Sequence, residues 1–153
     1  MYGQIVKNLM FGQDVLTYQK LKGLFGSFGK ALDTASLAEL RRYTPEEGQG
    51  PNTISVMVFD GIPVDIAFSM VTKKGNRDAR YGRLVFARTD GDEARIFWVT
   101  YFDQEGALQV SGGVAIDMTK TERFDIFYRR LWELLDIRFD EVENFNEIVT
   151  ERG

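Results

Sequence analysis

Between Thr53 and Met70 apolar residues occupy every second position, which is the period of a β-strand. Asp60-Gly61 interrupts this alternation with a dipeptide typical of tight turns. The apolar positions on the two sides of the turn are Ile54, Val56, Val58, Ile62, Val64, Ile66, Phe68 and Met70. This segment therefore predicts a β-hairpin.

Three more strands are predicted after a polar, basic loop over residues 73–81. They lie around Leu84, over residues 95–102, and from Leu108 through a bulge at Gly112-Gly113. Strands joined by short turns pair antiparallel, because parallel pairing needs a long crossover. We therefore expect a five-stranded antiparallel meander over residues 54–118.

Helical periods precede this sheet. Over residues 13–43 apolar side chains recur at spacings of three to five, which places them near one stripe: Leu16, Leu21, Leu24, Phe25, Phe28, Ala31 and Leu32. The three glycines Gly23, Gly26 and Gly29 predict a break or a close packing contact. A second short helix is expected from Thr34 or Ser36 to Tyr43, followed by a loop over residues 44–53.

Another helical pattern follows the sheet. Thr119 and Glu122 have the spacing of a capping box, and an amphipathic run follows over residues 124–135. Apolar positions continue to Ile148, which predicts a helical region over 119–149. The expected fold is a single α+β domain over residues 1–153: a helical arm (1–43), the sheet, and an amphipathic C-terminal helix packed on the sheet.

Composition narrows the chemistry. The 153 residues include no His and no Cys, which removes His general bases, Cys nucleophiles and the usual zinc, haem and iron–sulfur ligands. We therefore expect no metal, no cofactor and no catalytic residue, and favour a protein that is not an enzyme. No apolar run has the length of a membrane span and no signal peptide is evident, so a cytoplasmic protein is expected.

Two motifs invite an enzymatic interpretation. The glycine segment 23–31 departs from a phosphate-binding loop, because five residues separate Gly23 from Gly29 and Ala31 has no hydroxyl for a metal. Asp60 and Asp65 flank one hairpin turn and form the weakest candidate, a metal-dependent hydrolase site. Ordinary turn chemistry explains Asp60 equally well.

The second face of the predicted sheet is unusually apolar. In a half-exposed meander one face should be polar, yet this one carries Met57, Phe59, Phe97, Val99 and Tyr101. The leading hypothesis is a non-enzymatic protein-interaction module, chaperone- or adaptor-like, that binds another polypeptide through apolar sheet or helix surface, with these five residues as the partner-binding site and a homodimer as the expected assembly. Alternatively, the N-terminal helices of the same chain cover this face.

A second hypothesis is a carrier of a small apolar ligand. The order of helices, meander and terminal helix resembles that of START-like ligand-binding cups, which implies a helix sealing a curved sheet around an apolar ligand. The pocket would be lined by Trp98, Phe102, Phe127 and Trp132. In size, acidity and element types the chain also resembles bacterial secretion chaperones, which implies polypeptide binding.

Basic and acidic residues are concentrated in different segments of the chain. Lys and Arg number 19 against 23 Asp and Glu, a net charge of −4 that makes nucleic acid an improbable partner. Residues 73–95 hold seven basic and four acidic side chains, whereas residues 133–153 hold seven acidic and two basic ones. We expect these two regions to attract each other, within one chain or between subunits.

Overall fold

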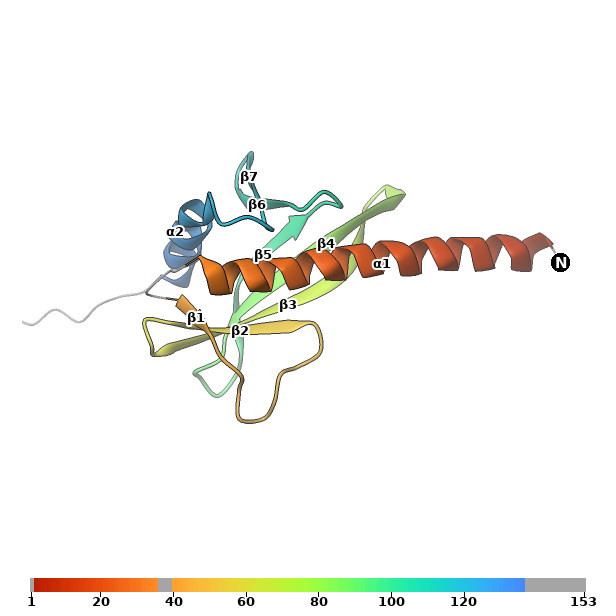
Figure 1. Cartoon of the computed structure of the whole chain (residues 1–153). Coiled ribbons are helices and arrows are strands. Elements are labelled where there is room, and N and C mark those ends of the chain that lie inside the picture. Colours follow the sequence, from red (N-terminus) through yellow and green to blue (C-terminus); the bar gives the residue numbers. More distant parts are fainter. Residues whose placement is uncertain (1, 36–39, 137–153) are drawn as a thin grey trace, which may run out of the picture.

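A long helix crosses one face of a curled antiparallel sheet, and a short helix lies beside it (Figure 1). The computed structural model describes residues 2–35 and 40–136. The helix α1 (Tyr2–Thr34) precedes the sheet and α2 (Phe124–Leu135) follows it. The α+β class with an antiparallel sheet is confirmed, and the expected helical continuation over 137–149 lies outside the described residues.

The sheet is a half-barrel of seven strands, each paired antiparallel with its neighbours in chain order. The predicted number of five is wrong. The strands are β1 (Leu40–Arg42), β2 (Thr53–Val58), β3 (Ile62–Lys73), β4 (Asn76–Arg88), β5 (Arg95–Phe102), β6 (Ala107–Ser111) and β7 (Val114–Asp117).

The prediction has two strands too few because two segments of the chain were assigned incorrectly. Residues 40–42 form β1 instead of a helix, because they pair with β2 and Leu40 is buried against the core. Gly112-Gly113 is the turn between β6 and β7 instead of a bulge, with Gly113 at a φ of 78° that glycine adopts without strain. The expected basic loop over 73–81 is also wrong, since β3 and β4 extend to a tight turn at Lys74-Gly75.

The helix α1 is continuous through Gly23, Gly26 and Gly29, so the expected break is wrong. The alternative, a close packing contact, is confirmed at Gly29. A Cβ there would lie 3.1 Å from the Arg42 Nη1 and 3.1 Å from the Ile54 Cδ1. Gly23 and Gly26 face open space instead. The N-terminal part of α1 extends past the sheet (Figure 1).

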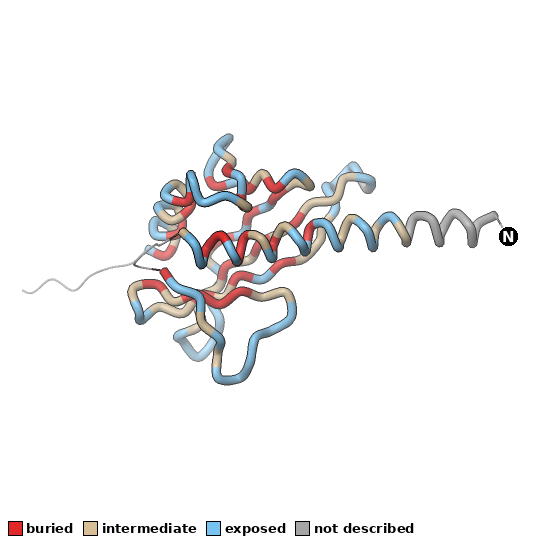
Figure 2. The backbone as a smooth tube through the Cα atoms, viewed as in Figure 1, coloured by how far each residue is buried: buried red, intermediate tan, exposed pale blue. Residues whose placement is uncertain are grey.

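Both helices pack on one face of the sheet, which we call the inner face. From α1, Phe25 stacks on Phe68 of β3 at a ring-centroid distance of 5.4 Å. From α2, Phe127 lies 5.7 Å from Trp98 of β5 and 5.4 Å from Phe28 of α1. Figure 2 shows buried positions along the part of α1 that crosses the sheet and along the strands beneath it. A single core therefore holds α1, the sheet and α2 together.

The amphipathic character of α2 is confirmed, because Phe124, Phe127, Leu131 and Leu135 are all buried. The predicted capping box at its start is wrong. The helix begins at Phe124, and the Thr119 hydroxyl donates to the Asp117 carboxylate at 2.6 Å. The hydroxyl of Thr119 is thus used in the turn after β7 and caps no helix.

Candidate functional site

The opposite side of the sheet, the outer face, is built from the strand positions that alternate with the core. Cross-strand pairs bring its side chains into rows. Val85 of β4 lies between Ala67 of β3 and Val99 of β5. Tyr101 of β5 pairs with Arg83, and Ile96 pairs with Ala87. The outer face is thus a mainly apolar surface over β3, β4 and β5.

None of the described helices lies on this face, because both pack on the inner one. Its side chains are accordingly open to solvent: Ile96 is 61% exposed, Val99 42% and Tyr101 45%. The expectation that the N-terminal helices cover this face does not hold for α1, whose aromatic side chains contact Phe68 and Phe127 on the inner side. The outer face therefore exposes apolar area to water.

Of the five residues proposed to bind a partner, Val99 and Tyr101 lie exposed on the outer face and Met57 lies half-buried on β2. Phe59 lies elsewhere, because β2 ends at Val58 and a φ of 53° turns the chain at Phe59. Its ring lies 5.1 Å from Trp132 of α2. Phe59 is therefore part of the contact between the β2–β3 turn and α2.

Phe97 is also displaced from the expected pattern. The pairing of β4 with β5 shifts by one residue between Phe86 and Ala87, so Phe97 is the extra residue of a β-bulge. Its ring lies 6.2 Å from buried Phe86 and packs against the core. Ile96, which strict alternation assigns to the inner face, is the exposed residue instead. A bulge leaves no mark in a hydrophobic pattern, so the sequence carried no signal for Ile96.

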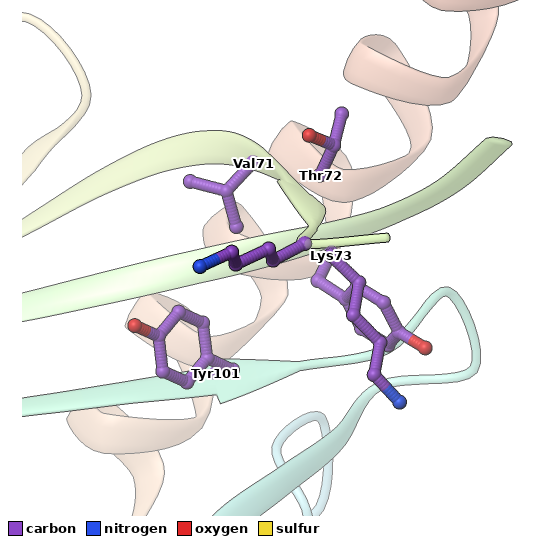
Figure 3. A pocket seen from close by; sticks show the side chains of 6 residues that line it. Val71, Thr72, Lys73 and Tyr101 are labelled. Carbon is purple, nitrogen blue, oxygen red and sulfur yellow. The ribbon is translucent and has the colours of Figure 1, made fainter. Parts of the chain in front are cut away.

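One end of the outer face forms a groove beside the β3–β4 turn. Its volume is about 410 Å³, and its lining residues are Val71, Thr72, Lys73, Lys74, Tyr81 and Tyr101. The side chain of Lys73 lies alongside Val71 and close to Tyr101 (Figure 3). The groove thus combines an apolar floor with two ammonium groups. Tyr81 was missed by sequence reasoning, because the basic residues around it indicated a loop.

The residues of the hypothetical ligand pocket fall into two groups. Trp98, Phe102 and Phe127 are buried in the core. The ring of Trp98 lies 4.5 Å from Phe86 and 5.7 Å from Phe127, so these side chains contact one another directly. Trp132 is 39% exposed and borders a shallow hollow with Arg129, Glu133 and Asp136. The four residues therefore do not face one common space.

Asp60 and Asp65, the two acids considered for hydrolysis, each interact with a different polar partner. Asp60 forms an exposed ion pair with Arg41, with 2.8 Å between the Arg41 Nε and the Asp60 Oδ1. Asp65 accepts a hydrogen bond of 2.6 Å from the Ser55 hydroxyl. Burial and the nearby Asp65 carboxylate raise the pKa of Tyr43. Within the described residues no group of carboxylates is arranged to hold a metal ion.

Comparison of the chain with protein-family models, with curated proteins and with solved structures finds no match. Over the ranges that the structure describes, neither helix has a stretch long and apolar enough to cross a lipid bilayer.

Proposed function

We propose that this protein is a non-enzymatic, chaperone- or adaptor-like interaction module that binds another polypeptide through the outer face of its sheet. The observation that carries the proposal is the exposure of Ile96, Val99 and Tyr101 on a face that neither helix covers. Tyr101 is the strongest of the three, because aromatic side chains are enriched in the buried centre of protein interfaces. The first partner that we propose is a second copy of the chain.

The pattern of burial supports this use of the face. Val99 and Tyr101 lie in β5, whose alternate residues Trp98, Thr100 and Phe102 are buried. The strand is therefore held rigidly from its inner side. A rigid surface loses little conformational entropy on binding, which favours association. The carrier hypothesis lacks comparable support, because aromatic rings in contact occupy the region between α2 and the sheet.

The test is Val99→Asp. A carboxylate at an open surface stays hydrated, so the monomer should keep its melting temperature within about 3 °C, as surface changes usually do. Inside an apolar interface the same carboxylate loses its hydration without a partner, so self-association should be lost. Thermal melting by circular dichroism and sedimentation velocity measure the two effects on one sample.

Val114→Asp is the matched control, because Val114 is 39% exposed against 42% for Val99 and also lies in a strand, β7. This variant should sediment as the wild-type protein does. If Val99→Asp unfolds the chain, or if both variants self-associate like the wild type, the outer face is not the interface.

A further inference from the structure

The groove at the end of the outer face differs from the rest of that face in charge. Val71, Tyr81 and Tyr101 form its apolar surface, and Lys73 and Lys74 stand exposed at its rim. Arg83, which pairs with Tyr101, adds a third positive charge on the same strands. The lining of the groove holds two lysines and no acidic residue, whereas the whole chain carries a net charge of −4.

A segment that fits such a groove needs apolar side chains for the floor and carboxylates for the rim. Residues 137–153 have this composition, with five acidic and two basic residues. Four of their apolar side chains are distributed among the acids: Phe139, Val142, Phe145 and Ile148. We propose that the groove of one subunit binds the acidic C-terminal segment, residues 137–153, of a second copy. This proposal rests on the self-association proposed above and assigns it a second contact.

The position of α2 favours a second copy over the same chain as the source. Trp132 of α2 contacts Phe59, immediately before β3 begins at Ile62, whereas the groove lies where β3 ends at Lys73. The strand β3 has twelve residues, so its two ends are about 36 Å apart along the strand at 3.3 Å per residue. The groove is also on the outer face, while α2 packs on the inner one. Asp140, Glu141 and Glu143 follow Asp136, the residue after α2, by only four to seven residues, which extend over at most about 25 Å, so these acids do not reach the groove of their own chain.

Appreciable binding requires both ion pairs with the lysines and apolar contact with the groove. Exposed ion pairs contribute little to binding, so the lysines alone would hold the segment weakly. An apolar side chain buried against Val71 and the two tyrosines supplies a contribution that salt does not screen. The electrostatic part should fall with ionic strength, since exposed charges are screened over about 10 Å at 0.1 M salt.

The test is zero-length carbodiimide cross-linking of the full chain, mixed from equal parts of unlabelled and ¹⁵N-labelled protein. This reagent joins a lysine amine to a carboxylate only where the two are in contact. We expect Lys73 or Lys74 to be joined to Asp140, Glu141 or Glu143, in peptide pairs that combine both isotopes. Mass spectrometry identifies the pairs and shows whether one chain or two contributed them.

A charge reversal extends the test. Lys73→Glu with Lys74→Glu should abolish these cross-links and weaken self-association by about tenfold at low salt, through lost attraction and new repulsion. Lys20→Glu with Lys22→Glu is the control, because both lysines are exposed on α1, away from the groove. A dimer in which Lys73 and Lys74 link only within one chain, or not to residues 137–153, overturns the inference and leaves the proposed function standing. A chain that is monomeric at every concentration overturns both.

Discussion

Phe127→Ala should lower the free energy of unfolding by about 3–5 kcal/mol, the usual cost of removing a buried Phe ring whose site cannot collapse. Phe127 is fully buried and is the point where α1, α2 and the sheet meet. Its ring lies 5.4 Å from Phe28, 5.7 Å from Trp98 and 5.9 Å from Phe124. Neighbours on three elements restrict relaxation, so the cavity should persist.

Urea titration followed by Trp fluorescence measures this loss, and Phe97→Ala is the matched control. The same atoms are removed there, but Phe97 is half-buried and its ring has Phe86 at 6.2 Å as a neighbour. The control should cost less, about 1–2 kcal/mol, because solvent already reaches part of the site. Equal losses at the two positions would mean that α2 is not anchored through Phe127.

Gly82→Ala should lower the free energy of unfolding by about 3 kcal/mol, at the upper end of typical overpacking costs. Gly82 in β4 is paired with Phe102 of β5, whose ring lies over the glycine. A Cβ on residue 82 would overlap that ring. Phe102 is 1% exposed and belongs to the core, so its ring can move only by displacing other core side chains.

Two further variants isolate this steric cause. Gly23→Ala makes the same chemical change in open space within α1 and should instead stabilise the protein by about 0.5–1 kcal/mol. Phe102→Leu removes the ring, so the double variant Gly82→Ala/Phe102→Leu should be less destabilised than the sum of the two single variants. Additive losses in denaturant titration would show that Gly82 is required for another reason.

The parts of the fold that follow local periodicity were predictable. The hairpin around Asp60-Gly61 appears as β2 and β3, because alternation over Ile54 to Met70 reflects which side chains are buried. β1 has three residues, too few to display a period, and it exists through its pairing with β2. The continuity of α1 through its glycines likewise depends on packing against the sheet, which helix propensity does not include.

The candidate site was predictable in kind but not residue by residue. The sequence predicts an apolar second face correctly at Val99 and Tyr101, because these residues follow the two-residue alternation of β5. The bulge at Phe97 and the end of β2 before Phe59 each shift one side chain away from that period. The groove joins the far ends of β3 and β4 to β5, and a pattern read along the chain does not show which strand ends meet.

The most direct test of the proposed interface is hydroxyl-radical footprinting of the full chain over a dilution series, in parallel with sedimentation. Tyr101 and Trp132 are comparably exposed in the subunit, at 45% and 39%, but they lie on opposite sides of the sheet. We predict that modification of Tyr101 slows as the dimer forms, because the partner covers the outer face, while modification of Trp132 continues at the same rate. Unchanged modification of Tyr101 across the transition, or protection of Trp132 in its place, would contradict the assignment of the outer face as the interface.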